Sequence, residues 1–428
     1  MKIFLDMVGC RLNQSEIESM ANKLRILGHQ IIASDTEADL VIINTCCVTA
    51  KASADSRKMI RHASKSNEKQ IIVTGCWATM FRDEAKKLPM VSSVVSNPQK
   101  NELISDLFGR TGIETPIGET NVREALPGER HRTRAFIKVQ DGCDNHCTFC
   151  ITCLARGRSR SVSFDVIKSD IQSAIRGNVH EIVLTGVQLG AYGYDQSPRS
   201  GLKGLIHEIS KFAPEVRIRL SSVEPWDIEE SFFDLWKSDN LCRHLHIPIQ
   251  SGSTKILQKM GRRLSPDQFK VLLQKALESI PGLAVTTDVI VGFPGEGDDE
   301  FIETINFIKD NQFAGGHVFT YSAMPGTPAA KFPDQVDHIV RKERNKIMRQ
   351  IFFKKVKLFN EQSIGETHQV LWETAKQEGG FWKLSGLSDN YLRVISHSEK
   401  PRNNTIDNVL ITRIETSGDK VWGVINNG

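Results

Sequence analysis

The 428-residue sequence contains no uninterrupted apolar run that approaches the length of a membrane-spanning helix. Its first residues, Met1-Lys2-Ile3-Phe4, begin a strand-like segment and lack the pattern of a signal peptide. These two absences argue against a membrane protein and a secreted protein, so we expect a cytoplasmic location. A hydrophobic content of 39% and a charged content of 25% are typical of a soluble globular protein, and the length allows two or three domains.

The chain also has little net charge, only +4, so charge alone does not indicate a nucleic-acid partner. The basic residues are nevertheless clustered. Residues 341 to 357 carry eight basic residues against one acidic residue, which suits phosphate contacts but is equally typical of a solvated helix face. Arginines also flank a cysteine-rich loop on both sides in sequence, and this clustering likewise suits phosphate contacts. They are Arg123, Arg130, Arg132, Arg134, Arg156, Arg158 and Arg160.

The nine cysteines are an odd number, and in a reducing compartment their loop positions favour metal or cluster ligation over disulfides. Cys143, Cys147 and Cys150 follow the spacing C-x3-C-x2-C on one Gly-containing loop. Three thiols can hold three irons of a 4Fe-4S cluster and leave the fourth iron open, where it can chelate a small molecule and pass it an electron. The alternatives are a zinc knuckle and buried thiols. His146 sits between the ligands and is expected to point away.

Residues 1 to about 100 alternate short apolar runs with amphipathic helical patterns, which predicts a parallel sheet with packed helices. The first three predicted strands each end at a cysteine, in Gly9-Cys10, Asn44-Thr45-Cys46 and Thr74-Gly75-Cys76. Strand-to-helix junctions of a parallel sheet share its carboxyl edge, so Cys10, Cys46 and Cys76 are expected to converge. This predicts a second three-cysteine cluster with an open iron. The alternatives are inert buried cysteines or a zinc site completed by a fourth group.

From residue 134 the pattern changes to six repeated strand and helix units, which predicts a partial version of the eight-unit barrel with its site at the carboxyl ends of the strands. Polar and glycine residues at these ends are candidates for contacts to ribose or methionine groups, although a glycine after a strand is often only a turn. The candidates are Thr185, Gly186, Gln188, Glu224, His246, Gln250 and Gly292.

Residues 366 to 428 alternate apolar and polar positions, with turns at Gly379-Gly380 and Gly418-Asp419, which predicts a small antiparallel barrel. Its aromatic residues can stack on unpaired bases or fill a small core. These residues are Trp372, Phe381, Trp382, Tyr391 and Trp422, interleaved with Lys383 and Arg393. We therefore predict an N-terminal α/β domain over 1–128, a barrel core over 129–364 and a terminal β-barrel over 365–428.

The sequence resembles the radical S-adenosylmethionine methylthiotransferase family over nearly its full length. The matching stretches are VGCRLNQSE, INTCCVT, VTGCWA, DGCDNHCTFC, ARGRSRS, LTGVQLGAYG, LSSVEP, HLHIPIQSGS, DVIVGFPGE and YSAMPGTPAA. The resemblance favours Cys46 over the adjacent Cys47 as a ligand, because the family motif has its cysteine directly after Asn-Thr. It places Phe149 near the adenine of S-adenosylmethionine and makes the terminal barrel an RNA-binding TRAM domain.

The stretches LTGVQLGAYG and SDNYLRV are most similar to the branch that acts on N6-threonylcarbamoyladenosine beside the tRNA anticodon. The resemblance implies two 4Fe-4S clusters and S-adenosylmethionine as cofactors. It implies that Cys143, Cys147 and Cys150 hold the cluster that cleaves S-adenosylmethionine to methionine and a 5′-deoxyadenosyl radical. The cluster on Cys10, Cys46 and Cys76 then holds or supplies the sulfur for carbon 2 of adenine.

The implied partners are the tRNA anticodon stem-loop and an external electron donor of the flavodoxin or ferredoxin type, with no membrane; a monomer is favoured. Isopentenyladenosine and a ribosomal-protein aspartate are sibling substrates, and a non-catalytic iron-sulfur RNA-binding protein is an alternative of another class. That alternative depends on Cys153, which follows Cys150 at C-x2-C where the family usually has a proline. We expect the chain that leads into Arg156 to carry Cys153 away from the cluster.

Overall fold

The computed structural model describes residues 1–65, 69–109, 122–124, 126–127, 133–197, 201–238 and 240–426. They form two compact units. Unit 1 comprises Met1–Asn178, Thr185–Gln188 and Ser322–Ala330, and unit 2 comprises Val179–Leu184, Leu189–Tyr321 and Lys331–Gly428. The predicted domain boundary at residue 128 lies outside the described residues, as do Arg130 and Arg132, so the division into three domains stays a prediction.

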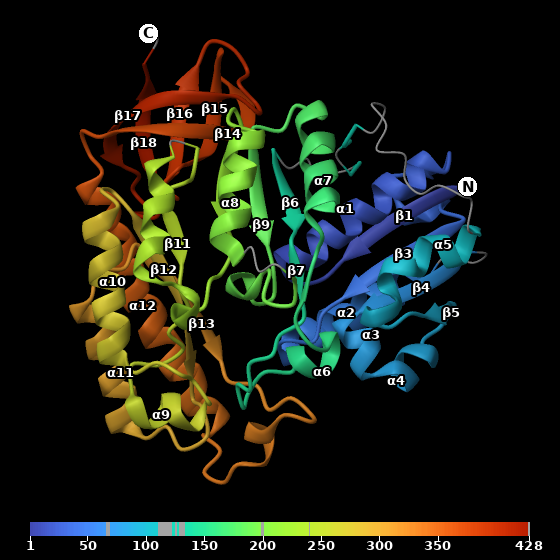
Figure 1. Ribbon diagram of the computed structural model, residues 1–428, viewed down its shortest axis with the longest axis horizontal. Coiled ribbons are helices and arrows are strands. Elements are labelled where there is room, and N and C mark those ends of the chain that lie inside the picture. Colours follow the sequence, from blue (N-terminus) through green and yellow to red (C-terminus); the bar gives the residue numbers. More distant parts are fainter. Residues whose placement is uncertain are drawn as a thin grey trace. The chain divides into compact units, whose positions relative to one another are not determined.

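Unit 1 contains a parallel sheet with strand order β2-β1-β3-β4-β5 (Figure 1). Its strands are β1 (Lys2–Met7), β2 (Gln30–Ile31), β3 (Leu40–Thr45), β4 (Gln70–Gly75) and β5 (Val91–Val94). Its helices are α1 (Arg11–Ile26), α2 (Ala50–Ala63), α3 (Cys76–Met80), α4 (Arg82–Lys86) and α5 (Leu103–Phe108). The alternation predicted from the sequence is confirmed, and the short strand β2 is an addition to it.

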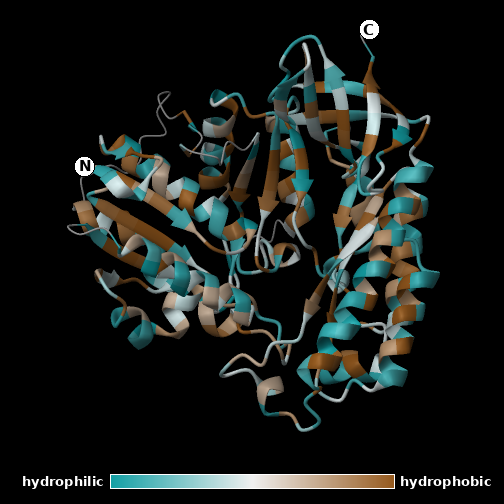
Figure 2. Ribbon diagram, turned by 180° about the vertical axis from the view of Figure 1, so that it is seen from behind, coloured by the Kyte–Doolittle hydropathy of each residue, from teal (hydrophilic) through white to brown (hydrophobic). Residues whose placement is uncertain are grey.

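Helices cover both faces of this sheet, which explains the apolar run of its central strand. Every residue of β3 is buried. Val41 and Ile43 pack in one core with Ile60 of α2, whereas Leu40 and Ile42 pack in a second core with residues of α1. Successive side chains of a strand point to opposite faces, so a strand covered on both faces is apolar throughout. Figure 2 shows the strands of this sheet mostly brown, the colour of hydrophobic residues.

The rest of unit 1 carries the cysteine-rich loop between short elements. These elements are β6 (Arg134–Lys138), β7 (Gln140–Asp141), α6 (Thr152–Arg156), β8 (Arg160–Ser161) and α7 (Phe164–Arg176). Strands β7 and β8 pair in antiparallel fashion, with Asp141 opposite Arg160. The chain that leaves the loop therefore returns alongside the chain that enters it.

Unit 2 begins with parallel strands in chain order. Strand β9 (Glu181–Thr185), whose last residue belongs to unit 1, pairs with β10 (Arg217–Leu220), and β11 (His244–His246) pairs with β12 (Ala284–Val291), which pairs with β13 (Gly315–Thr320). Single parallel bridges, such as Ser222 with His246, connect β10 to β11. The helices are α8 (Gly201–Phe212), α9 (Thr254–Lys259), α10 (Pro266–Ser279), α11 (Asp298–Asp310) and α12 (His338–Gln362). The predicted partial barrel is confirmed in class, although residues 230 to 237 form a 3-10 helix.

The C-terminal residues of unit 2 form a closed barrel with strand order β14-β15-β16-β18-β17. Its strands are β14 (Thr367–Glu378), β15 (Phe381–Ser388), β16 (Arg393–Ser398), β17 (Ile406–Ile414) and β18 (Val421–Ile425). Brown and pale or teal segments alternate along these strands in Figure 2, as expected for strands with one buried face. The predicted small β-barrel is confirmed.

Two buried arginines attach this barrel to the parallel strands of unit 2. Arg217 and Arg219 each donate to Glu181 at 2.7 Å. Arg217 also donates to the carbonyl of Gln369, and Arg219 to that of Ser388, both at 2.9 Å. Glu181 is fully buried, and its single carboxylate is shared by two cations that have left water in order to bind barrel carbonyls.

The basic helix α12 is more than a solvated surface. Arg344 is buried and pairs with Glu296 at 2.8 Å, while Arg341 donates to the carbonyl of Tyr321 at 2.8 Å. Lys355 donates to the carbonyl of Asn311 at 2.7 Å. These three side chains hold the helix in place and are not available to phosphate. The exposed basic residues of the predicted patch are Lys342, Lys346, Arg349, Lys354 and Lys357. Within the described part of the chain, no helix combines the length and apolar character needed to cross a bilayer.

Candidate functional site

The three N-terminal cysteines follow three neighbouring strands of the unit 1 sheet. Cys10 follows β1, Cys46 follows β3 and Cys76 follows β4, and these strands are adjacent in the order β1-β3-β4. In the register of the sheet, Met7 lies opposite Asn44 and Thr45 lies opposite Gly75. The predicted convergence at the carboxyl edge is therefore present in the backbone.

Close packing brings these strand ends together. Gly9 has a φ of +121°, and a Cβ at this position would lie 3.0 Å from the Cys46 Sγ. Glycine is needed here both for the backbone conformation and for the close approach. The pKa of Cys46 is raised to about 12, mainly by burial; the neighbouring Cys10 and Cys76 contribute to this rise, while Arg156 opposes it. Each of the other two sulfurs therefore lies within electrostatic reach of Cys46.

The adjacent Cys47 has a different environment. It is fully buried in the apolar core that contains Ile60 and Trp77, although Cys76 also lies in that core. Burial is the main cause that raises the pKa of Cys47. Cys76 also raises the pKa of Cys47, whereas Cys10 is a cause of the shift only at Cys46, and this supports the choice of Cys46 as a ligand.

Backbone hydrogen bonds tie the second cysteine loop to the segment that follows it. The N–H of Cys143 donates to the carbonyl of Gly157 at 3.1 Å. Gly142 has a φ of +72°, and a Cβ there would lie 1.9 Å from the carbonyl oxygen of Arg158. Only glycine permits this approach, so the sequence Asp141-Gly142-Cys143 fixes the first thiol against residues 157 and 158. His146 is exposed.

The surroundings of the loop thiols fit a cluster that binds thiolates. The N–H of Asn145 donates to the Cys143 sulfur and the N–H of Thr152 donates to the Cys150 sulfur, each at 3.4 Å. Hydrogen bonds of this kind stabilise and tune cluster thiolates. The Asn145 side-chain nitrogen is buried and has no hydrogen-bond partner among the described residues, so a donor is available for a cluster sulfide.

Burial raises the pKa of Cys150 to about 11, so without a cation this thiol stays protonated. Among the described residues, no three His, Cys, Asp or Glu side chains are arranged to hold a single metal ion. In a 4Fe-4S cluster each thiolate binds a different iron, so its ligands need not converge on one point.

Cys153 lies beside the loop thiols, and the expectation that it is carried away is wrong. Its sulfur donates to the carbonyl of Asn145 at 3.1 Å. A hydrogen bond with Cys143 is the largest influence on the Cys153 thiol and lowers its pKa, while burial and the nearby Cys150 and Cys147 oppose this effect. Helix α6 has only five residues, and the N–H of Gly157 donates to the Cys153 carbonyl at 2.9 Å. The chain therefore turns back immediately.

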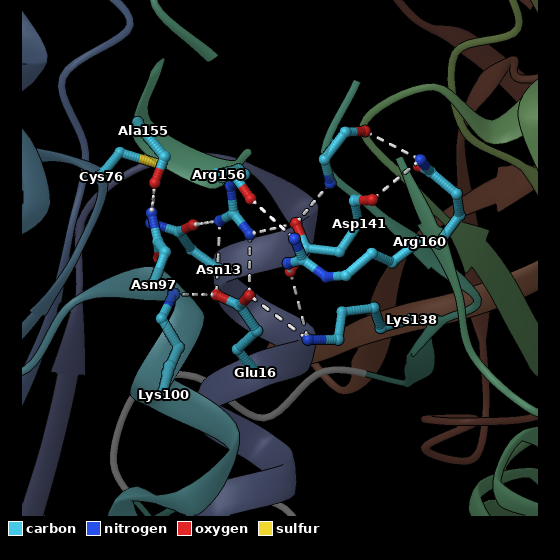
Figure 3. Close-up of polar contacts among 12 residues, drawn as sticks. Asn13, Glu16, Cys76, Asn97, Lys100, Lys138, Asp141, Ala155, Arg156 and Arg160 are labelled. Atoms are coloured by element: carbon cyan, nitrogen blue, oxygen red, sulfur yellow. Dashed lines mark hydrogen bonds and ion pairs between the residues drawn. The ribbon is translucent and has the colours of Figure 1, made fainter. Parts of the chain in front are cut away.

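A buried ionic network joins helix α1 to the segments before and after the cysteine loop (Figure 3). The guanidinium group of Arg156 donates to Glu16 at 2.8 Å, to Asp141 at 2.9 Å and to the Asn13 side-chain oxygen at 2.7 Å. Lys100 reaches Glu16 at 2.6 Å from the opposite side. Arg156, Lys100 and Glu16 are each at most 5% exposed. Arg156, predicted as a candidate for phosphate contacts, is therefore an internal ion-pair residue.

The charges in this network hold each other in their ionised forms. Burial alone would raise the pKa of Glu16, but Arg156 and Lys100 outweigh burial and hold this pKa well below its usual value. Burial lowers the pKa of Lys100, and Glu16 opposes that shift. Glu16 lies on α1, the helix that begins directly after Cys10, and Arg156 is the last residue of α6. The network therefore connects the helix that begins after Cys10 with the short helix that begins after Cys150.

Asn97 makes a second connection between the two cysteine regions (Figure 3). Its side-chain nitrogen donates to the Cys76 sulfur at 3.5 Å and to the carbonyl of Ala155 at 2.7 Å. Asn97 is buried, and its N–H donates to Thr79 at 2.9 Å. Local sequence patterns do not point to Asn97, Lys100 or Glu16, because the partners of these residues are distant in sequence. The one available signal is that Glu16 belongs to the stretch VGCRLNQSE.

Four predicted cofactor residues lie in unit 1 with the loop. The side-chain oxygen of Gln188 accepts a hydrogen bond from the Cys143 sulfur at 3.4 Å. The main-chain N–H of Gln188 donates to the side-chain oxygen of Gln140 at 2.9 Å. The Thr185 carbonyl accepts from the N–H of Val139 at 3.0 Å, and Gly186 follows it directly. Phe149 is half-buried within the loop.

The other four predicted cofactor residues lie in unit 2. Glu224 forms a bidentate ion pair with Arg262, at 2.7 and 3.1 Å. The His246 ring contacts Asp288 at 3.2 Å and Thr286 at 2.9 Å. The remaining two residues are Gln250 and Gly292.

Gln250 has a φ of +77°, rare for a residue with a side chain, and its buried Oε1 has no partner among the described residues. At Gly292 a Cβ would lie 2.1 Å from a side-chain carbon of Arg341, so packing already explains this glycine. The role of all eight residues as cofactor contacts stays a prediction.

Aromatic residues of the terminal barrel divide between a core and a surface hollow. Trp372 is fully buried and donates to Asp407 at 2.7 Å, and Trp382 packs against the same core. Tyr391 stacks on His244, with ring centroids 4.0 Å apart. A hollow of about 700 Å³ is lined by Phe381, His397, Lys400, Arg402, Arg413 and Trp422, among others. This hollow combines aromatic rings with positive charge.

Two family models match the sequence. Uncharacterized protein family UPF0004 matches residues 2–96, and the Radical SAM superfamily matches residues 137–308. The first range covers the strands that end at Cys10, Cys46 and Cys76, and the second covers the C-x3-C-x2-C loop.

Three curated relatives align with most of the chain. The threonylcarbamoyladenosine tRNA methylthiotransferase MtaB of Bacillus subtilis is 37% identical over 91% of this chain and 88% of the relative. The tRNA-2-methylthio-N(6)-dimethylallyladenosine synthase of Clostridium tetani is 30% identical, with 96% and 93% covered. The ribosomal protein uS12 methylthiotransferase RimO of Trichlorobacter lovleyi is 32% identical, with 88% and 87% covered.

A solved structure with a similar fold is the radical S-adenosylmethionine methyltransferase TsrM from Kitasatospora setae. It matches with a TM-score of 0.59 and 12% identity, over 88% of this chain and 79% of that chain. At this identity the likeness shows the fold alone.

Proposed function

The chain belongs to the radical S-adenosylmethionine methylthiotransferase family, and from this premise we propose that it inserts a methylthio group at carbon 2 of N6-threonylcarbamoyladenosine in tRNA. The enzyme is a transferase whose cofactors are S-adenosylmethionine and two 4Fe-4S clusters. The choice of base is supported by the 37% identity to a relative named for threonylcarbamoyladenosine, against 30% and 32% for relatives named for other substrates. The stretches LTGVQLGAYG and SDNYLRV point to the same branch.

One observation carries the proposal. Two separate sets of three cysteines occur in the same compact unit, each at a position suited to an incompletely ligated cluster. Cys143, Cys147 and Cys150 are assigned to the cluster that holds S-adenosylmethionine, and Cys10, Cys46 and Cys76 to the second cluster. The direct hydrogen bonds that join the two regions support a shared function, because Asn97 and the Arg156 network contact both.

When bound, S-adenosylmethionine and the two clusters supply the radical and sulfur-transfer chemistry that an unactivated purine C–H position requires. The chain's own residues position these groups. The N–H groups of Asn145 and Thr152 orient the sulfurs of Cys143 and Cys150, and Gln188 lies beside Cys143. Within unit 2, the unpartnered Oε1 of Gln250 can accept a hydrogen bond from an amine or hydroxyl group.

The surface hollow of the terminal barrel is the proposed contact for tRNA. Stacking on an aromatic side chain is worth about 1–3 kcal/mol per base, and the nearby arginines suit phosphate groups. Replacing Trp422, which lies 4.7 Å from the guanidinium group of Arg413, with Ala is expected to weaken tRNA binding about tenfold. Tyr391→Phe is the matched control, because Tyr391 is a barrel aromatic that stacks on His244 and does not line the hollow.

The function is tested by nucleoside mass spectrometry of tRNA from a deletion strain. Loss of 2-methylthio from threonylcarbamoyladenosine, restored by the wild-type gene and not by Cys143→Ala, is the expected result. Unchanged threonylcarbamoyladenosine with loss of 2-methylthio from isopentenyladenosine would indicate the sibling tRNA substrate. A methylthio group missing from a ribosomal-protein aspartate would indicate the protein substrate. Absence of 5′-deoxyadenosine after reduction with S-adenosylmethionine would favour a non-catalytic RNA-binding protein.

The ligand assignment is tested by iron analysis of the anaerobically reconstituted protein. About eight irons per chain are expected for two 4Fe-4S clusters, and Cys46→Ala should lose about half of them. The control is Cys47→Ala, which removes the neighbouring buried thiol and should keep all of them. Loss of iron in Cys47→Ala with retention in Cys46→Ala would contradict the assignment.

A further inference from the structure

A fourth thiol accompanies the three proposed ligands of the loop. Cys153 continues the spacing from Cys150 with two intervening residues. Its sulfur donates to the Asn145 carbonyl, while the N–H of the same Asn145 donates to the Cys143 sulfur. The thiols of Cys153 and Cys143 are therefore hydrogen-bonded to the main-chain carbonyl and N–H of the same residue, Asn145. Cys153 is only partly buried, so the position is not simply a core contact.

The backbone makes this placement a fixed property of the loop. Cys143 is bound through its N–H to the carbonyl of Gly157, and Gly157 is bound through its N–H to the carbonyl of Cys153. Residues before and after the loop are thus connected through Gly157, whose φ of +77° allows the reversal. These bonds hold the backbone of residue 153 close to that of Cys143.

We propose that Cys153 ligates the fourth iron of the loop cluster when S-adenosylmethionine is absent, and yields this position when S-adenosylmethionine binds. The proposal rests on the assignment of Cys143, Cys147 and Cys150 made above. Four thiolates complete the ligation of a 4Fe-4S cluster, whereas the proposed activity requires an open iron. The fourth thiolate must therefore be displaceable.

The Asn145 carbonyl provides the displaced position. Ligation releases the Cys153 proton to solvent and forms one iron–sulfur bond. When S-adenosylmethionine binds, that bond breaks, the thiolate regains a proton from solvent and the thiol again donates to Asn145, as in the structure. No electron is transferred in this exchange. Its effect is to protect the fourth iron of the resting enzyme, which an open site leaves prone to loss.

The test compares wild type, Cys153→Ala and Cys153→Ser in the full-length protein, reconstituted anaerobically. Without S-adenosylmethionine, mild ferricyanide oxidation should convert several-fold more of the loop cluster to the 3Fe-4S form in Cys153→Ala than in wild type, as measured by electron paramagnetic resonance. With S-adenosylmethionine, the two proteins should behave alike. Cys153→Ala should also bind S-adenosylmethionine several-fold more tightly, because no ligand has to be displaced. Cys153→Ser should lie between the two.

A Cys10→Ala/Cys46→Ala/Cys76→Ala background isolates the loop cluster and separates the possible failures. If this background keeps about four irons but Cys153→Ala yields the same amount of 3Fe-4S cluster and the same affinity as its parent, the role of Cys153 is refuted and the proposed function stands. If the background binds no iron, the assignment of the loop cluster fails, and the inference about Cys153 fails with it.

Discussion

Among the charged groups of unit 1, the carboxylate of Glu16 is the one whose removal should reduce the stability of that unit most. It is the only acidic partner of Lys100 among the contacts described for that side chain, and it shares Arg156 with Asp141. We predict that Glu16→Gln, which keeps the shape and removes the charge, destabilises the fold around both cysteine regions.

The magnitude follows from what each cation retains. Breaking a buried ion pair by removing one partner typically costs about 3–5 kcal/mol. Arg156 keeps Asp141 and the Asn13 oxygen, whereas Lys100 keeps only the neutral Asn44 oxygen at 3.2 Å. Lys100 can escape part of the penalty by losing its proton, since burial already lowers its pKa. We therefore expect a loss near the lower end, about 3 kcal/mol.

Hydrogen exchange followed by mass spectrometry is the suitable assay, because a chain with two units need not unfold in one step. A loss of 3 kcal/mol should speed exchange about 100-fold in peptides from α1 and α6, with peptides from unit 2 as the internal reference. Glu37→Gln is the matched control, because its ion pair with Lys2 is exposed and is worth less than about 1 kcal/mol. Adding Lys100→Met to Glu16→Gln should recover part of the stability by removing the unpaired cation.

Exchange in Glu16→Gln within threefold of wild type would refute the reasoning. The reasoning would also be refuted if the double variant Glu16→Gln/Lys100→Met were less stable than Glu16→Gln alone.

Three further predictions concern other buried polar groups. Asn97→Leu removes the hydrogen bond to the Cys76 sulfur and should lower the reduction potential of the second cluster by about 40 mV, measured by a redox titration; an unchanged potential would remove Asn97 from this role. Glu181→Gln leaves two buried guanidinium groups unneutralised and should cost about 3–5 kcal/mol, seen as faster proteolytic release of the terminal barrel; release at the wild-type rate would contradict it. Burial raises the pKa of Asp170 to about 6, so the folded chain holds this proton more tightly than the unfolded chain does. The resulting stabilisation is full below about pH 4 and is lost as the pH rises through 6. Because the side chain is partly exposed, Asp170→Asn should raise the free energy of unfolding by only about 1–2 kcal/mol at pH 7.5, measured by urea unfolding. If the stability of both proteins depends on pH in the same way, the effect is excluded.

Local sequence patterns were sufficient for the fold and for the convergence of Cys10, Cys46 and Cys76. Strand and helix periods are properties of neighbouring residues, and the rule that parallel strands share a carboxyl edge supplies the rest. The ion-pair network could not be predicted in this way. Arg156 and Glu16 are 140 residues apart, and nothing local in either helix indicates which distant charge will balance it.

The wrong prediction for Cys153 has a definite cause. The sequence suggested that the chain through Arg156 leads away from the loop, but residues 152 to 156 form a short helix and Gly157 reverses the chain. Similarly, composition alone could not tell which aromatic residues of the barrel lie in its core and which lie on its surface. Trp372 lies in the core, whereas Trp422 lines the surface hollow. Such differences depend on tertiary contacts and not on residue type.

The three sheet cysteines have a spacing set by main-chain pairing. Neighbouring strands lie about 4.8 Å apart whatever their side chains do, and β1, β3 and β4 keep that separation through their ladders. A scaffold of this kind needs no metal in order to form. Under the proposed assignment, the loss of a cluster to oxygen leaves the three cysteines in place. Iron and sulfide can then reassemble the cluster without refolding of the chain.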